Sequence, residues 1–260
     1  FFYIVVMVMA NTGLPLAALG PTSDMALSTT QEIINSNTVY VGDDLCFPLD
    51  CFPIPNHYKD TLESIMLPHG LIKDRVQKLA QDICGIYKTD TIHFLVVLKG
   101  SSIFFHDLME CIQRYHELGF WNEDHIPFTF DFLKAKSYQG TQSTGDVKID
   151  VSGVNLDDLA GKHVLFVEDI VDTGHTMKAL VEMLSKASHP PASIRCVSLL
   201  QKRLTSAPFY TADFIGFSIP DKFVVGYGLD FDEAYRDLRP LAVANAEGRC
   251  RYRRAPPPAA

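Results

Sequence analysis

The chain is short of positive charge, and it lacks three patterns that would each indicate a class of protein. Its 23 Lys and Arg stand against 31 Asp and Glu, and the net charge of −8 argues against a nucleic-acid surface. It contains no internal repeat and no apolar run long enough to cross a bilayer, so we expect no membrane partner. No CxxC pair occurs, and several cysteines lie in apolar segments, so we expect reduced core thiols in a cytoplasmic protein. The six cysteines are Cys46, Cys51, Cys84, Cys111, Cys196 and Cys250.

The chain has enough apolar residues for a sizeable core in one or two domains, since 47% of its 260 residues are hydrophobic. We expect a variable, disordered extension at 1–37, a folded domain at 38–252 and a proline-rich tail at 253–260. The apolar start at 1–10 has two interpretations. It is either a signal-peptide core without a basic segment before it, or part of an extended gene model whose real start is at Met25 or earlier.

Residues 164–176 are the most informative stretch. An apolar run predicts a buried strand, which ends on three acids within five residues: Glu168, Asp169 and Asp172. A Thr-Gly-His-Thr loop follows, and then apolar residues at helical spacing from Met177 to Leu184. Loop and helix N–H groups can bind phosphate, and carboxylates can bind sugar hydroxyls or a hard cation such as Mg²⁺. The alternative is a plain strand, turn and helix in which the acids only cap the helix.

Strand and helix patterns alternate along the rest of the folded part. Strands are predicted at 91–98, 128–133 and 193–200, with short β segments at 213–217 and 223–227. Helical spacing begins at Ile72 and Phe104, and 134–150 is predicted as a long polar loop. The alternation predicts an α/β fold with a mainly parallel twisted sheet and helices on both faces. Ligands bind beyond the carboxyl ends of such strands, where Lys99, Glu168, Asp169 and Lys202 fall.

The segment 167–174 resembles the diphosphoribosyl-binding signature of type I phosphoribosyltransferases. Further motifs resemble the hypoxanthine-guanine branch of this family, in the family's order from about Asp43 to Tyr252: 68–75, 98–101, 133–138, 143–146, 199–203, 219–227, 229–230 and 235–238. The resemblance implies a core at about 70–202 and a small hood formed by 38–69 and 203–252.

The implied reaction is purine salvage. Hypoxanthine or guanine reacts with phosphoribosyl diphosphate and gives IMP or GMP and diphosphate. The resemblance also implies Mg²⁺ as cofactor and a homodimer or homotetramer.

Residue roles are implied in the same way. Asp172 is similar to the general base that takes the purine N7 proton. Glu168 and Asp169 resemble ribose and metal-water ligands, and Asp230 the second metal ligand. Lys99 and Gly100 resemble the diphosphate loop, in which the family has a non-proline cis peptide, and Arg236 resembles a diphosphate contact. Lys202 resembles the donor to the purine 6-oxo group. The implied nucleotide site is completed by Ile170, Val171, Thr173, Gly174, His175, Thr176, Lys222, Phe223 and Val224.

One position in the phosphate loop departs from the pattern of many family members. Many members carry Lys where His175 stands, so phosphate binding is weaker here if that charge matters and His175 is neutral.

The resemblance also implies a mobile loop that closes over the reactants and keeps water out, formed by Lys136, Ser137 and Tyr138.

Two other functions stay open on the sequence alone. The first is a catalytically weak, nucleotide-binding paralogue with a regulatory or interaction role; Asp172 argues against it, since one known branch has Gly there. The second is an adenine or orotate phosphoribosyltransferase; Lys202 and the segment 221–226 argue against it.

Overall fold

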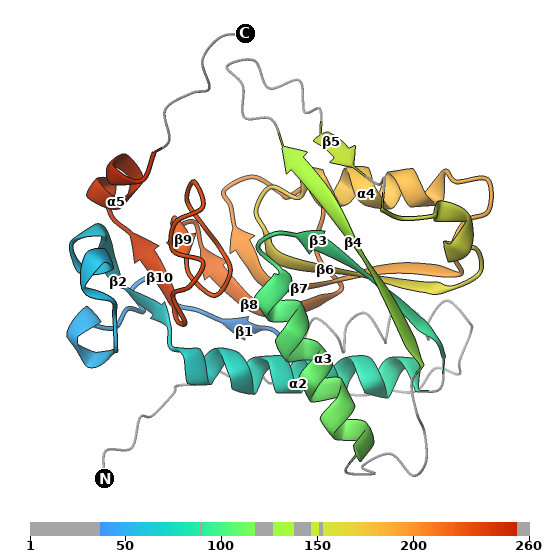
Figure 1. Ribbon diagram of the computed structural model, residues 1–260, viewed down its shortest axis with the longest axis horizontal. Coiled ribbons are helices and arrows are strands. Elements are labelled where there is room, and N and C mark those ends of the chain that lie inside the picture. Colours follow the sequence, from blue (N-terminus) through green and yellow to red (C-terminus); the bar gives the residue numbers. More distant parts are fainter. Residues whose placement is uncertain (1–36, 89, 118–126, 138–146, 151–152, 254–260) are drawn as a thin grey trace, which may run out of the picture.

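The protein has a large and a small β-sheet with helices packed around the larger one (Figure 1). The computed structural model describes residues 37–88, 90–117, 127–137, 147–150 and 153–253. No helix in these ranges is long and apolar enough to cross a membrane.

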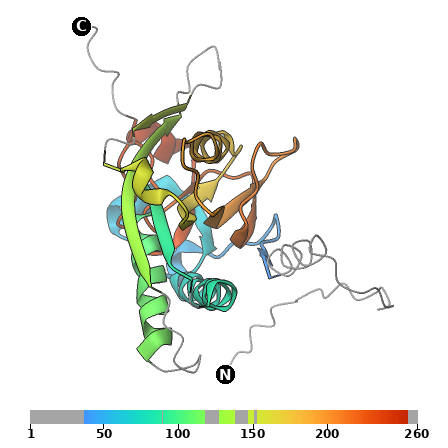
Figure 2. The same ribbon diagram turned by 90° about the vertical axis from the view of Figure 1, so that its right-hand side faces the viewer.

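The large sheet has seven strands in the order β1-β8-β7-β6-β3-β4-β5. All neighbours run parallel except β4 and β5, which are antiparallel. Helices α2 and α3 cover one face and α4 covers the other, as Figures 1 and 2 show. The prediction of a mainly parallel sheet with helices on both faces is confirmed. The strands are β1 (Val39–Tyr40), β3 (Ile92–Leu98), β4 (Phe128–Ser137), β5 (Val147–Asp150), β6 (His163–Val171), β7 (Ser193–Arg203) and β8 (Phe214–Pro220), and the helices are α2 (His69–Tyr87), α3 (Ser102–Glu117) and α4 (His175–Ser185).

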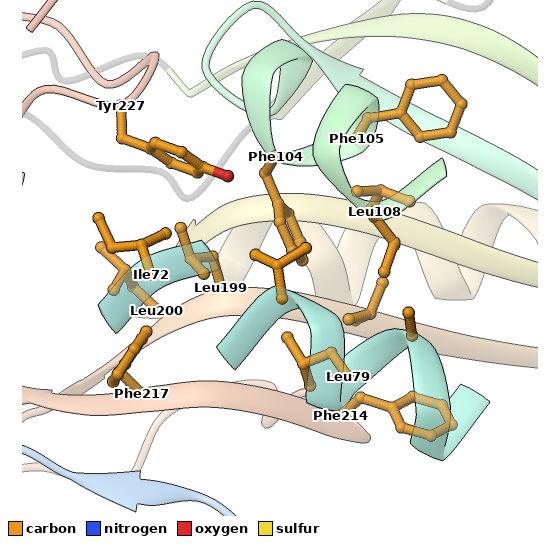
Figure 3. Packing of buried hydrophobic residues seen from close by; sticks show 14 of the residues in the cluster. Ile72, Leu79, Phe104, Phe105, Leu108, Leu199, Leu200, Phe214, Phe217 and Tyr227 are labelled. Atoms are coloured by element: carbon orange, nitrogen blue, oxygen red, sulfur yellow. The ribbon is translucent and has the colours of Figure 1, made fainter. Parts of the chain in front are cut away.

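Alternate residues of the central strands pack into two separate cores. On β3, Phe94 and Val96 join the core under α2 and α3, whereas Leu95 and Val97 join the core under α4. Figure 3 shows the first core, where side chains of α2 and α3 meet Leu199 of β7 and residues of β8. A strand with both faces covered reads as a continuous apolar run, which is why the sequence predicts these strands well.

The small sheet is antiparallel in the order β2-β10-β9 and lies beside the large sheet. Its elements come from two distant parts of the chain: η1 (Leu49–Cys51), η2 (Asn56–Thr61) and β2 (Leu62–Leu67), then β9 (Val224–Val225), β10 (Leu241–Ala244) and α5 (Ala246–Arg251); the remaining element, η3 (Leu156–Leu159), precedes β6. The division into a core at about 70–202 and a hood at 38–69 and 203–252 stays a prediction. Within those hood ranges, β1 and β8 pair in the large sheet.

Several boundaries differ from the sequence prediction. Strand β4 runs on to Ser137, and β5 returns beside it, so both ends of the predicted 134–150 loop are strands. Strand β7 continues three residues beyond the predicted end at Leu200, to Arg203. The polar residues in these extensions hid them, because they break the apolar run that identified each strand. Strands β2 and β10 were not predicted, since pairing between distant short segments leaves little local signal.

A buried arginine fastens helix α2 to strand β8. Arg75 is 7% exposed, and its Nε and Nη2 donate to the carbonyls of Gly216 and Ile215, each at 2.9 Å. Strand β1 pairs with β8 only at Phe217 and Ser218, so Arg75 supplies donors where the edge strand is missing.

We expect Arg75→Met to lower the free energy of unfolding by about 2–4 kcal/mol, because it leaves two buried carbonyls without donors. Urea unfolding measures the change. Lys78→Met is the control, because Lys78 lies on the same helix and pairs with Asp82 at the surface. Equal losses in the two variants would contradict the assigned role of Arg75.

Candidate active site

The site lies where strand β6 loses one neighbour. With β3, β6 pairs only as far as Val96 and Val167. With β7 it continues to Val171 and Gln201. The C-terminal end of β6, which carries Glu168 and Asp169, therefore has no strand paired with it on the β3 side. The predicted acids are thus part of the strand and lie at its unpaired flank.

Asp169 fills this gap against Gly100. Its Oδ1 accepts a hydrogen bond from the backbone N–H of Ile170 at 2.8 Å. A Cβ at Gly100 would lie 1.6 Å from Asp169 Oδ2, so the contact requires glycine at this position. On its other side Gly100 meets Gly228, where an added Cβ would lie 2.3 Å from the Gly100 carbonyl oxygen.

Glu168 and Asp169 form a partly buried acidic pair. Burial raises the pKa of Asp169 to about 6, and burial together with the neighbouring Asp169 raises the pKa of Glu168 well above its usual range. The Oε2 atom of Glu168 is buried and has no hydrogen-bond partner among the described residues. The pair therefore keeps a proton to higher pH than two free carboxyl groups would, and a bound cation would favour its loss.

The loop after β3 starts with a cis peptide bond between Leu98 and Lys99, as expected for the diphosphate loop of the family. Lys99 Nζ lies 3.0 Å from Glu233 Oε1. Arg236 Nε lies 3.3 Å from the other oxygen of Glu233. These two cations, first Lys99 and then Arg236, lower the pKa of Glu233, so its carboxylate stays ionised near neutral pH.

Arg236 has two further partners. Its Nη2 lies 2.7 Å from Asp230 Oδ1, and its Nη1 donates to the Gly228 carbonyl at 2.7 Å. The second oxygen of Asp230 accepts from the backbone N–H of Glu233 at 2.7 Å. The loop after β9 thus brings three charged side chains close to the loop after β3: Asp230, Glu233 and Arg236.

Lys202 lies at the carboxyl end of β7 and contacts the predicted base. Its Nζ is 3.0 Å from Asp172 Oδ2 and 3.2 Å from Asp221 Oδ1. The Lys202 side chain is only 11% exposed, whereas Asp172 is 51% exposed. A largely covered lysine side chain and an accessible carboxylate therefore lie side by side.

The Thr-Gly-His-Thr loop leads into α4 and is packed against 209–210. Gly174 has φ +85°, and a Cβ there would meet the Tyr210 backbone nitrogen at 2.5 Å. The Thr173 carbonyl accepts from the Phe209 N–H at 2.8 Å. The His175 ring stacks on Phe209 with centroids 3.8 Å apart. Thr176 lies in the first turn of α4, where backbone N–H groups have no acceptor within the helix, as a phosphate site needs.

Three of the predicted binding residues have side chains that pack in the protein interior. Ile170 packs against the first core, and Val171 lies in the second. Val224 is likewise buried, within β9.

Phe223 packs in the hood with one edge contact. Its ring meets Phe231 edge-on with centroids 5.5 Å apart, and the Arg249 guanidinium lies over the ring, 5.9 Å from its centroid. Lys222 precedes it, with its N–H donating to the Pro220 carbonyl at 2.8 Å. Of the predicted mobile loop, Lys136 and Ser137 end strand β4, and Tyr138 lies outside the described residues.

The acidic residues fit Mg²⁺ carried on a phosphate better than Mg²⁺ held by the protein alone. The predicted ligands Glu168, Asp169 and Asp230 offer hard oxygen donors, and the buried Glu168 Oε2 is unpartnered among described residues. They do not converge closely enough for a three-residue cage. Mg²⁺ usually keeps several waters and takes one or two carboxylates plus substrate phosphates, which suits this arrangement.

One other group of possible ligands, on α3, is already neutralised. His106, Asp107 and Glu110 come together, and they are the only such group within the described ranges. Lys73 lies 2.9 Å from Asp107, and Arg114 lies 2.9 Å from Glu110. This group is an ion-pair network between α2 and α3.

Four contact residues were not predicted from the sequence: Phe209, Asp221, Glu233 and Arg249. Asp221 lies within the motif 219–227, and Glu233 lies between the motifs 229–230 and 235–238. The charge of these two residues was therefore the available signal. Phe209 and Arg249 reach the site only through the tertiary fold.

Comparisons with known proteins agree with this geometry. Residues 64–232 match the family described as Phosphoribosyl transferase domain. The chain is 43% identical over 221 residues to hypoxanthine-guanine phosphoribosyltransferase of Rattus norvegicus, covering 85% of this chain and 98% of the relative. It is 44% identical over 216 residues to that of Homo sapiens, covering 83% and 96%. The crystal structure of the Schistosoma mansoni hypoxanthine-guanine phosphoribosyltransferase in complex with IMP superposes with a TM-score of 0.69 at 30% identity, covering 84% of this chain and 100% of the other.

From the raised pKa values of the acidic pair we predict that Glu168→Gln stabilises the ligand-free protein, and that the gain in melting temperature depends on pH. The folded state binds more protons than the unfolded state once the pH exceeds the ordinary carboxyl range, so the pair makes the protein less stable as pH rises toward and beyond about 6. The substitution removes this effect. We expect its melting temperature to exceed that of the wild type by at least about 2–4 °C more at pH 8 than at pH 5.

Differential scanning calorimetry without Mg²⁺ measures the two curves. Glu182→Gln is the control, because Glu182 is an exposed α4 residue whose carboxylate pairs with Lys186. A Glu168→Gln gain that is constant with pH would refute the acid-pair interpretation.

Proposed function

The chain belongs to the phosphoribosyltransferase family, among the hypoxanthine-guanine enzymes, and from this premise we propose how its residues carry out the reaction. It is an enzyme of purine salvage. It transfers the 5-phosphoribosyl group from phosphoribosyl diphosphate to N9 of hypoxanthine or guanine, and IMP or GMP and diphosphate are formed. The observation that carries the residue assignment is the contact between Lys202 and Asp172, 3.0 Å apart at the end of the central strands.

This contact matches one edge of a 6-oxopurine. The O6 acceptor and an N7–H donor are neighbours on that edge, and Lys202 and Asp172 offer a donor and an acceptor side by side. Asp172 takes the N7 proton as N9 attacks the ribose, so it acts as the general base. Lys202 has only donors, so it pairs with the keto group and opposes the amino group of adenine.

The acids of β6 and the loop after β3 serve the ribose and the leaving group. Glu168 and Asp169 bind the ribose hydroxyls or metal-bound water. Lys99, the Gly100 backbone and Arg236 bind diphosphate oxygens, and Asp230 offers a further metal ligand. Mg²⁺ on the diphosphate would neutralise leaving-group charge. These groups together stabilise the charge that develops as the bond to diphosphate breaks.

The remaining groups position the nucleotide. The loop 173–176 binds the 5′-phosphate through backbone N–H groups and hydroxyls at the start of α4. Stacking on Phe209 fixes the His175 ring beside that phosphate. Phe223 stacks on the purine through the ring face away from Arg249, and the Val224 backbone meets the purine edge at C2.

The paralogue alternative is not favoured, because Asp172 is present and half exposed at the site. Two further predictions concern the cellular compartment and the oligomeric state. The cytoplasm is the proposed compartment, which the six free thiols support. A homodimer or homotetramer is the proposed assembly, by analogy with the family.

The test of the function is a panel of free purines with phosphoribosyl diphosphate and Mg²⁺, read out as product nucleotide. Guanine and hypoxanthine should give GMP and IMP, and adenine should give no product above background. Absence of product from every purine would move the assignment to the paralogue.

We expect Asp172→Asn to lower kcat by about 10²–10⁴-fold, because the amide keeps the shape and the Lys202 contact but cannot take a proton. Steady-state kinetics with guanine measures the loss. Thermal unfolding of the same variant should be close to that of the wild type. Wild-type turnover in Asp172→Asn would remove this residue from the base role.

We expect Lys202→Met to relax base selection, because it keeps the apolar stem and removes the donor to O6. The ratio of kcat/KM for guanine to that for adenine should fall by at least about tenfold. Lys186→Met, at the exposed end of α4, is the control. Unchanged selectivity in Lys202→Met would place base selection on other residues.

A further inference from the structure

Glu233 binds both cations assigned to the diphosphate. One carboxylate oxygen lies 3.0 Å from Lys99 Nζ, and the other lies 3.3 Å from Arg236 Nε. Lys99 has no other ion-pair partner among the described residues. A single carboxylate thus stands between the two positive groups that a diphosphate would have to reach.

The backbone conformation at Glu233 is unfavourable for a glutamate. Phe231 and Ala234 exchange hydrogen bonds of 3.2 and 3.0 Å and close a two-residue turn. Asp232 and Glu233 inside it have φ of 49° and 73°, the left-handed region that such turns usually fill with Asn-Gly. A glutamate at the second position is disfavoured locally, and violations of this kind are expected where a side chain is needed for function.

We infer that Glu233 is a positioning residue of the diphosphate subsite, which occupies the place of the diphosphate in the ligand-free enzyme. Its carboxylate keeps Lys99 and Arg236 paired and aimed at one point, and an incoming diphosphate group displaces it. The inference rests on the proposed roles of Lys99 and Arg236.

The other contacts of the cluster allow this exchange. When Glu233 is displaced, Arg236 keeps Asp230 at 2.7 Å and the Gly228 carbonyl at 2.7 Å, so the guanidinium stays in place. Lys99 precedes Gly100, whose backbone is packed between Asp169 and Gly228, so only the Lys99 side chain needs to turn. Glu233 is half-exposed and lies at the surface, where ion pairs are weak, so the competition is modest and a ligand with several charges overcomes it.

The consequence is that removal of the carboxylate should tighten diphosphate binding. Glu233→Gln keeps the size of the side chain and removes the competing charge. We expect the Kd for diphosphate with Mg²⁺ to fall about two- to tenfold. The KM for phosphoribosyl diphosphate should fall in parallel, while the KM for guanine should stay within about twofold of the wild type.

Isothermal titration calorimetry of magnesium diphosphate into the full chain measures the Kd. Glu110→Gln is a matched control, because Glu110 is an exposed carboxylate that also lies between a lysine and an arginine, 3.7 Å from Lys73 and 2.9 Å from Arg114. It should bind diphosphate as the wild type does.

Glu233→Gly separates the two effects of this residue. Glycine suits the left-handed backbone, so the melting temperature should rise, and diphosphate binding should tighten as it does in Glu233→Gln. Weaker or unchanged diphosphate binding in both variants would overturn the inference. Failure of the wild type to bind magnesium diphosphate would instead overturn the proposed function.

Discussion

Beyond Val167 strand β6 keeps its hydrogen bonds with β7 and loses those with β3, and the site is built in the gap. In a sheet covered on both faces, such a gap is where main-chain and acidic groups can reach a ligand without crossing the core. The Asp169 carboxylate fills part of the gap and excludes any side chain from Gly100. The loop after β3 is therefore placed by the end of the strand pairing, and the diphosphate contacts depend on it.

The lysines and the arginine of the ligand-free site each form an ion pair with a carboxylate of the same chain. Lys202 binds Asp172 and Asp221, Lys99 binds Glu233, and Arg236 binds Asp230. Each substrate must replace one of these internal pairs with its own donors and acceptors. In the proposed mechanism the purine edge does so at Lys202 and Asp172, and the diphosphate does so by displacing Glu233 from Lys99 and Arg236. The acids of β6 form no ion pair among the described residues, and burial raises their pKa values, whereas Lys99 and Arg236 lower the pKa of Glu233.

The sequence was sufficient for the parts of the fold whose signal is local. The continuous apolar runs identified β3, β6 and β7, and the motif 167–174 identified the residues at the open end of β6. It was insufficient where pairing is distant: β2 and β10 are short, and they pair with each other although they lie in distant parts of the chain. The same limit applies to the site, since no local pattern connects Glu233 with Lys99, which precedes it by 134 residues.

The two sheets are coupled through the segment after β9. The Tyr227 hydroxyl donates to Asp107 on α3 at 2.5 Å, and Lys73 on α2 binds the same carboxylate at 2.9 Å. The next residue, Gly228, packs on the Gly100 carbonyl and accepts from Arg236. One short segment therefore anchors the small sheet to the helices and also sets the distance between the diphosphate loop and its arginine. Because Phe223, the ring proposed to stack on the purine, precedes the same segment, a shift of the small sheet would move the proposed purine and diphosphate contacts together.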